Sequence, residues 1–455
     1  MAGMLSFDSL AEAVTHGEID TVIAAQTDMQ GRLMGKRFHA DYFIDSAHKE
    51  THSCNYLLAT DMEMDTVEGF QSTSWAAGYG DYVMKPDLST LRRIPWLEGT
   101  ALVLCDVFDH HGKHEIAHAP RTMLKKQLQR LEKHSYRAMM ASELEFFLFR
   151  EDYDDIRFQG FDELTPYSAY NEDYHIFQTT KEEDVMREIR NGLNEAGIPV
   201  ENSKGEADAG QVEINVRYAD ALVMADRHSI MKNGIKEIAY DQGRAITFMA
   251  KWSSKFAGNS SHLHQSLTTM DGFPIFYDAQ QPHSMSKIMQ HYLAGLLHYS
   301  KDITLMLAPN INSYKRFSAG TFAPTKAVWS MDNRTAGYRI CGADTRSVRV
   351  ECRIGGADLN PYIAYSAMLA AGLKGIEDKL ELPPIFQGDA YTADGIPEIP
   401  ATLREAIDAF SNSAMLRAAL GDDVVDHYTH AACHEQAQFD RAVTNWEQKR
   451  YFERG

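Results

Sequence analysis

Four short segments of the chain alternate polar and apolar residues, and this pattern constrains the fold more than any other feature of the sequence. Because residues i and i+2 of a strand point to the same side, each segment predicts a strand with one polar and one apolar face. Strands of this kind are typical of antiparallel sheets. The four segments are residues 142–148, 211–216, 260–266 and 349–353.

Placed side by side in one antiparallel sheet, the polar faces of these strands would gather five carboxylates and an imidazole. Carboxylates that share one surface repel each other unless cations neutralise them. Oxygen ligands with a single imidazole suit Mg²⁺ or Mn²⁺ better than zinc. For any one strand alone, an ordinary solvent-exposed face is the alternative interpretation. The residues concerned are Glu143, Glu145, Glu206, Glu213, Glu351 and His262.

The segment 312–353 is rich in arginine although the whole chain carries a net charge of -19. It holds six arginines and three acids. A guanidinium group matches phosphates and carboxylates bidentately, which favours an anion site, whereas a single arginine taken alone is more often part of a surface ion pair. With the acidic strands, the arginines predict a metal-dependent site for phosphoryl transfer. The chain has neither a GxxxxGK[ST] loop nor a GxGxxG loop, so a nucleotide would be held in an unusual way.

Composition and charge narrow the class of protein. No apolar run approaches the roughly 18 residues of a membrane span, and the N-terminus lacks the pattern of a secretory signal, so we expect no membrane partner. The five cysteines are odd in number and lack CxxC spacing, which argues against a disulfide framework. A cytoplasmic location is expected. The acidic balance argues against nucleic-acid binding.

The order of predicted elements indicates an α+β protein with two domains, residues 1–112 and 113–455. Residues 20–44 read as a hairpin with a turn at Gln30-Gly31. The histidines of 109–118 favour a solvated turn over a metal site. Pro120 is suited to the first position of a helix. We also expect a strand at 101–107, helices at 182–196, 220–241 and 284–300, a helix from Pro361, and a helical tail over 401–450.

Several motifs together resemble the glutamine synthetase superfamily over roughly residues 20–455. The resemblance implies a small β-grasp-like N-terminal domain and a catalytic domain with a curved antiparallel sheet backed by helices. It also implies stacked rings of subunits, with a dodecamer expected and active sites between subunits. The motifs are ExE (143–145), E-x3-GQxE (206–213), HxHxS (262–266), NSYKR (312–316), NRT with Arg339, and RVECR (349–353).

The same resemblance implies a role for each motif residue, with ATP and two or more Mg²⁺ or Mn²⁺ ions as cofactors. One metal would be held by Glu145, Glu206 and Glu213, and the other by Glu143, His262 and Glu351. The nucleotide would contact Glu201, Tyr218, His264, Ser266, Arg339 and Arg349. Glutamate would contact Gly258, Arg316 and Arg353. Arg334 would stabilise the transferring phosphoryl group, with Glu206 and Arg316 as further catalytic residues.

The sequence departs from the family pattern mainly at positions that, in glutamine synthetases, bind ammonium or help to remove its proton. Where glutamine synthetases carry a flap glutamate, the run SAGTFAP places Phe322. Their DGSS-like stretch is replaced by EGFQSTSW, with Glu68 as a stand-in, and Ala257 stands where an asparagine is usual. An ammonium ion needs acidic partners, whereas Phe322 adds apolar surface.

The sequence is therefore similar to the γ-glutamyl-amine ligase branch, which joins the γ-carboxylate of glutamate to a small amine through a γ-glutamyl phosphate. The alternatives are a glutamine synthetase that uses ammonium and a catalytically silent relative with a structural or regulatory role. The sequence does not specify the amine.

Overall fold

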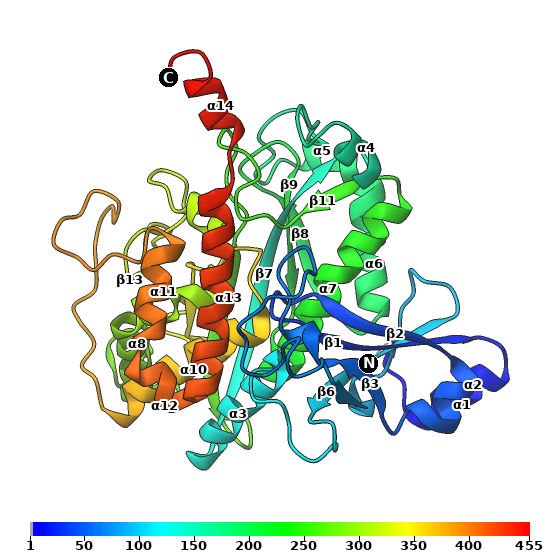
Figure 1. Ribbon diagram of the computed structural model, residues 1–455. Helices are drawn as coiled ribbons and strands as arrows, with labels where there is room; N and C mark the ends of the chain where they lie inside the picture. Colours follow the sequence, from blue (N-terminus) through cyan, green and yellow to red (C-terminus); the bar gives the residue numbers. More distant parts are fainter. Residues whose placement is uncertain (1–2) are drawn as a thin grey trace.

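The computed structural model describes residues 3–455, and the six strands between residues 21 and 108 form one sheet (Figure 1). The strand order is β2-β1-β6-β4-β3, with β5 paired to β6. The β1–β2 hairpin is antiparallel, and β1 also pairs with β6 in parallel. The strands are β1 (Thr21–Thr27), β2 (Leu33–His39), β3 (Thr51–Cys54), β4 (Asp81–Pro86), β5 (Arg92–Arg93) and β6 (Thr100–Phe108).

A second sheet of nine strands carries all four of the alternating segments. Its order is β13-β14-β15-β12-β7-β9-β8, with β10 and β11 both paired to β7. All pairs are antiparallel except β13–β14. The strands are β7 (Tyr136–Phe149), β8 (Val200–Gly205), β9 (Gln211–Val216), β10 (Ala219–Asp220), β11 (Ala245–Thr247), β12 (Ser261–Thr269), β13 (Trp329–Met331), β14 (Tyr338–Cys341) and β15 (Arg349–Cys352).

Helices cover the apolar side of this second sheet (Figure 1). The longer helices of the whole molecule, not all of which lie on this sheet, are α1 (Phe7–Thr15), α3 (Pro120–Lys133), α6 (Glu183–Glu195), α7 (Ala221–Asp241), α8 (Lys287–His298), α9 (Ser300–Leu307), α10 (Pro361–Glu377), α11 (Leu403–Ser411), α12 (Ala414–Leu420), α13 (Asp422–Arg441) and α14 (Asn445–Tyr451). The shorter ones are α2 (Ala40–Tyr42), η1 (Phe43–Ala47), η2 (Asn55–Leu58), η3 (Leu88–Thr90), α4 (Tyr153–Phe158), α5 (Ile176–Thr179), η4 (Thr180–Glu182), η5 (Pro282–Ser284) and η6 (Ile311–Arg316).

Helix α10 lies at the centre of the core and is buried on nearly every side. Its sequence explains this position, because small and apolar residues surround the whole helix. Asn360 caps its first turn and Pro361 occupies the first helical position, where the missing N–H costs nothing. Gly372 lets the ring of Tyr292 on α8 approach closely, since a Cβ there would lie 2.1 Å from a ring carbon. The crossing of α8 and α10 therefore depends on this glycine.

The N-terminal region and the region that carries the second sheet are joined by buried polar contacts. The guanidinium of Arg121 donates to Asp87 and Asp106 on one side and to Asp226 of α7 on the other. Asn360 donates its amide to the backbone oxygen of Asp28 at 3.1 Å. These contacts fix the first sheet against the second.

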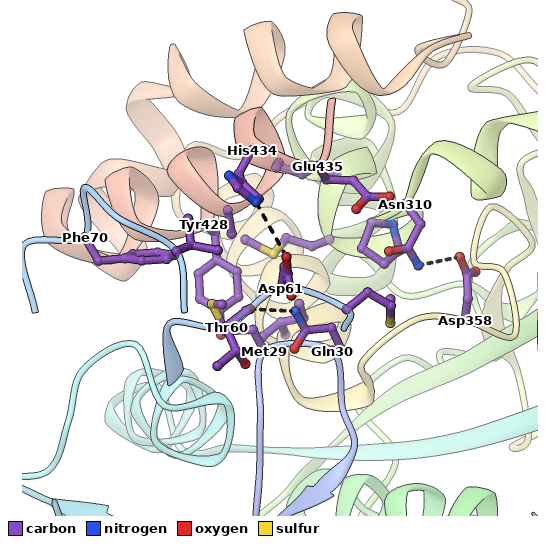
Figure 2. A pocket seen from close by; sticks show the side chains of 18 residues that line it. Met29, Gln30, Thr60, Asp61, Phe70, Asn310, Asp358, Tyr428, His434 and Glu435 are labelled. Carbon is purple, nitrogen blue, oxygen red and sulfur yellow. Dashed lines mark hydrogen bonds and ion pairs between the residues drawn. The ribbon is translucent and has the colours of Figure 1, made fainter. Parts of the chain in front are cut away.

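The loop after η2 docks on α13 beside a cavity shown in Figure 2. Asp61 accepts a hydrogen bond from Gln438 at 3.0 Å and lies 3.7 Å from Nε2 of His434. On the same helix, the ring nitrogens of His427 and His430 lie 2.7 Å from the backbone oxygens of Leu58 and Glu68. One face of α13 thus holds the first part of this loop, as far as Glu68.

The expected fold class is confirmed, and the expected helices and strands are present with some changes. The helix expected over 284–300 begins at Lys287, and a second helix, α9, follows it directly. The strand that carries Glu143 begins earlier than expected, at Tyr136. Strands β8, β10, β11, β13 and β14 were not predicted, because strands of two to six residues are too short to show a full polar–apolar alternation.

The histidine loop was only partly predicted correctly. His110, His111 and His114 are exposed, as a solvated turn requires. His118 is instead buried, and its ring stacks on that of His427 with centroids 4.0 Å apart. Contact with α13, which sequence periodicity cannot reveal, explains this difference.

Two observations concern the surface of the molecule. Within residues 3–455, the helices are all too short or too polar to cross a membrane. Helix α14 extends away from the body of the protein, and none of its residues is buried (Figure 1).

Candidate active site

Strand register brings the acidic and imidazole side chains together. In the β7–β12 pair, Glu143 lies opposite His262, and in the β12–β15 pair, His264 lies opposite Glu351. In the β7–β9 pair, Glu145 lies opposite Glu213. Because directly opposite residues of an antiparallel pair share one face, the polar faces of four strands meet in one place.

The first cluster consists of Glu145, Glu206 and Glu213, whose carboxylate oxygens lie within 4.8 Å of one another. Burial, together with the charge of Glu206, raises the pKa of Glu145 to about 8. Burial and the neighbouring glutamates raise the pKa of Glu213 to about 9. Nζ of Lys204 forms an ion pair with Glu206. The cluster thus holds three carboxylates, which outnumber the two cations, Lys204 and Arg316, that act on Glu145.

The second cluster consists of Glu143, His262 and Glu351, again within 4.8 Å. Nδ1 of His262 lies 3.0 Å from Glu143 and 3.7 Å from Glu351. Nε2 of His262 is buried and has no hydrogen-bond partner in the described part of the chain. Nδ1 is the ring nitrogen that faces both carboxylates, so it is the atom placed to bind a metal with them.

The electrostatics of this second cluster differ from those of the first. Burial alone would raise the pKa of Glu143, but hydrogen bonds with His262 and His264 hold that pKa well below its usual range. Burial also opposes ionisation of Glu351, yet His262 and Arg353 lower the pKa of Glu351 to about 2. Both carboxylates are therefore ionised at neutral pH.

Arginines surround Glu351 on two sides. Arg339 donates to Oε2 at 2.9 Å, and Arg353 donates to Oε1 at 2.6 Å. Nε of Arg349 donates to Nδ1 of His264 at 3.2 Å, and Nε2 of His264 lies 2.8 Å from Glu143. Ser266 follows on the same face of β12, two residues beyond His264. Arg339, Arg349, His264 and Ser266, which were expected at the nucleotide, thus lie on the same side of the sheet as the second cluster, together with Arg353, which was expected at glutamate.

Arg334 and Arg316 have opposite surroundings. Arg334 is exposed and makes no hydrogen bond or ion pair with residues 3–455. Arg316 is 1% exposed, and its guanidinium donates to Ser260 and to the backbone oxygens of residues 353–355. A Cβ at Gly258 would lie 2.4 Å from the Arg316 side chain, so glycine makes room for this arginine. Arg334 is available to an incoming anion, whereas Arg316 supports the backbone.

Phe322 lies on an exposed flap between these arginines in the sequence. It is 58% exposed and adopts a left-handed backbone conformation with φ of 57°. Its backbone oxygen accepts a hydrogen bond from Arg353 at 3.4 Å, and the next oxygen, of Ala323, accepts one from the Tyr391 hydroxyl at 2.9 Å. The backbone of Phe322 is thus held next to Arg353, and its apolar side chain is exposed.

The structure does not bring every expected residue to the clusters. Glu201 and Tyr218 are both exposed, near the ends of β8 and β9, with no hydrogen bond to the other candidates. Glu68 is exposed on the loop held by α13.

Sequence reasoning missed three residues near the site. Lys204 lies on β8, which alternation did not reveal. Cys341 donates to Glu351 at 3.2 Å from the neighbouring strand β14. Tyr391 comes from a loop beyond α10, so only tertiary structure places it beside the flap.

Comparisons with known proteins agree with this geometry. The family model described as "Glutamine synthetase, catalytic domain" matches residues 117–451. The chain is 47% identical to gamma-glutamylethanolamide synthetase GlnA4 of Streptomyces coelicolor, over 99% of this chain and 96% of that protein. It is 36% identical to glutamate–isopropylamine ligase of a Pseudomonas species, over 96% and 95%. The solved structure titled "Apo GmaS without ligand" superposes with a TM-score of 0.85 at 26% identity, over 98% and 99%.

Proposed function

Because the chain belongs to the glutamine synthetase family, we propose that it is an ATP-dependent ligase that joins glutamate to an amine. The γ-carboxylate of glutamate attacks the terminal phosphoryl group of ATP, and ADP leaves. The amine then displaces phosphate from the γ-glutamyl phosphate and loses a proton, which leaves a γ-glutamyl amide. The observation that carries the proposal is the pair of clusters that share β7, one around Glu145 and one around Glu143.

The two clusters fit hard divalent cations. Three carboxylates in the first cluster and two carboxylates with one imidazole in the second are donor sets suited to Mg²⁺ or Mn²⁺. The raised pKa values of Glu145 and Glu213 and the position of Nδ1 of His262 beside two carboxylates support the same assignment. Bound cations would neutralise phosphate charge in this site. We propose two or more ions for each site.

The roles of the surrounding residues follow from their environment. Arg339, Arg349, His264 and Ser266 line the second cluster and would hold the phosphates of ATP, with Glu201 and Tyr218 as outer contacts. Exposed Arg334 would stabilise the phosphoryl group during transfer, because a guanidinium group offers several donors to a phosphate. Arg353 and Gly258, with Arg316 beneath them, would position glutamate. Glu206 would complete the metal site nearest that glutamate.

The apolar flap favours an amine with a hydrocarbon group over ammonium. Phe322 supplies no charge to an ammonium ion but can contact a carbon substituent. Two relatives whose names contain ethanolamide and isopropylamine support this choice.

Self-association into stacked rings, with a dodecamer expected, is part of the proposal. Helix α14 supports it, since it extends from the body with Trp446, Tyr451 and Phe452 exposed. Size-exclusion chromatography with light scattering tests this point. We place the enzyme in the cytoplasm, where ATP is supplied, and cell fractionation tests that location.

An amine panel tests the activity. The purified protein is incubated with glutamate, ATP and Mg²⁺ plus ammonium, methylamine, isopropylamine, ethanolamine, putrescine or aniline. ADP release and the mass of the γ-glutamyl product are measured. Turnover with an organic amine supports the proposal, whereas turnover with ammonium alone makes the chain a glutamine synthetase. No turnover with any amine would identify a silent relative.

A further inference from the structure

A third group of ligating side chains overlaps the second cluster. One atom each of His264, Cys341 and Glu351 lies within 4.8 Å of the other two, and all three residues are buried. They come from the neighbouring strands β12, β14 and β15. Sγ of Cys341 donates to Oε2 of Glu351 at 3.2 Å. The thiol therefore points into the candidate active site and away from the core.

The donor set of this third group differs in kind from those of the two clusters. Thiolate, imidazole and carboxylate together are the ligands of zinc and similar thiophilic cations. Mg²⁺ and Mn²⁺ gain little from sulfur, because they prefer oxygen ligands. Two classes of cation would thus select different ligands from the same small region.

We propose that His264, Cys341 and Glu351 bind a thiophilic divalent cation of the zinc type, and that its binding inhibits the enzyme. The thiol proton passes to solvent as the metal–sulfur bond forms. The inhibition rests on the proposed ligase function, whereas the binding does not. No other cysteine within residues 3–455 belongs to such a ligand group.

Shared residues explain why occupancy would stop the reaction. Glu351 is common to this group and to the second cluster, so a cation bound through Cys341 withdraws Glu351 from the cation expected beside His262. Binding would also displace two arginines that lie beside the group. In the structure, Arg339 donates a hydrogen bond to Oε2 of Glu351, and Arg349 donates one to Nδ1 of His264. A cation that uses those atoms must displace these guanidinium groups from the positions proposed to contact phosphate.

Cobalt substitution tests binding without turnover. The full-length protein is treated with a chelator, Co²⁺ is added, and the near-ultraviolet band from thiolate-to-cobalt charge transfer is recorded. Wild type should show the band, and both Cys341→Ser and Cys341→Ala should lose it. Cys433→Ser is the matched control, because Cys433 is exposed on α13 and should leave the band unchanged. A band that persists in both Cys341 variants, or is absent from wild type, would overturn the proposed site.

Zinc inhibition tests the consequence for catalysis. Rates with Mg²⁺ are measured against increasing Zn²⁺ and are normalised to the zinc-free rate of each variant. Removing one ligand should raise the half-inhibitory zinc concentration by about tenfold or more in Cys341→Ser. Cys433→Ser should match wild type. Equal inhibition of all three proteins would refute the inhibitory role. A cobalt band in a protein without ligase activity would overturn only the proposed function.

Discussion

Replacing Phe322 by alanine provides a quantitative test of amine selection. Complete burial of a phenylalanine side chain is worth about 1.5–3 kcal/mol. Because 58% of Phe322 is exposed, contact with the carbon substituent of an amine can add about 0.9–1.7 kcal/mol by the same scale. Since about 1.4 kcal/mol corresponds to a tenfold change, kcat/KM for isopropylamine should fall about 4- to 18-fold in Phe322→Ala.

Ammonium provides the internal control, since it has no carbon atoms to contact the ring. Its kcat/KM should change less than about twofold in Phe322→Ala, because no apolar burial is lost. Phe322→Leu keeps an apolar side chain and should retain most of the isopropylamine activity. Phe322→Glu should shift the preference toward ammonium, since a carboxylate can pair with the cation.

The assay is initial-rate ADP release with saturating glutamate and ATP and with each amine varied. The backbone at this position is left-handed, so alanine, leucine and glutamate carry the same type of strain and can be compared directly. An equal loss for isopropylamine and ammonium would refute the contact, since it would indicate a disordered flap. Unchanged amine preference in Phe322→Glu would also count against it.

Three further predictions concern metal, pH and the two arginines. Mg²⁺ should raise the Tm of wild type and raise that of Glu213→Gln less, because one of the crowded carboxylates is already neutral in the variant. Scanning fluorimetry measures both Tm shifts, and equal shifts would contradict the first cluster as a metal site. Burial raises the pKa of Glu182 from 4.5 to about 9. The contribution of Glu182 to the free energy of unfolding is therefore complete below the pKa of the unfolded state. This contribution is lost as the pH rises toward 9, by up to about 1.4 kcal/mol per pH unit. Urea titrations between about pH 5 and 8.5 should therefore show a flatter profile for Glu182→Gln, and parallel profiles would refute this. Arg316→Met should lower the free energy of unfolding by about 3 kcal/mol or more, because several buried oxygens lose a donor. Arg334→Met should change the free energy of unfolding by less than about 0.5 kcal/mol but reduce kcat about 1,000-fold. A stable, slow Arg316→Met and an unstable Arg334→Met would contradict the roles given to the two arginines.

The sequence predicted the candidate site better than it predicted the environment of each residue. Alternation placed Glu143, Glu145 and His262 on one face, and the observed register then brought them together as expected. Alternation could not show that Arg316 is buried, since its partners are backbone oxygens of the segment that follows β15. Chain contacts of this kind depend on tertiary packing and leave no periodic signal.

The same limit applies to loops and to short strands such as β8. Tyr391 and Lys204 lie in segments with little pattern, yet one anchors the flap and the other pairs with Glu206. Turn propensity predicts that a loop exists but does not predict which residues the loop contacts. Cys341 was counted only as a free thiol, because its neighbour Glu351 belongs to a different strand.

The buried contacts between the two sheets determine how the protein unfolds. Arg121 binds acids from both regions, and Trp96 donates to Glu237 of α7 at 2.7 Å. Separating the regions would leave these charges and donors unpaired, which is costly in a buried environment. We therefore expect one cooperative thermal transition, with the slowest-exchanging amides of β6 and β7 opening at the same free energy. On this account the proposed boundary after residue 112 separates two sheets within a single folding unit.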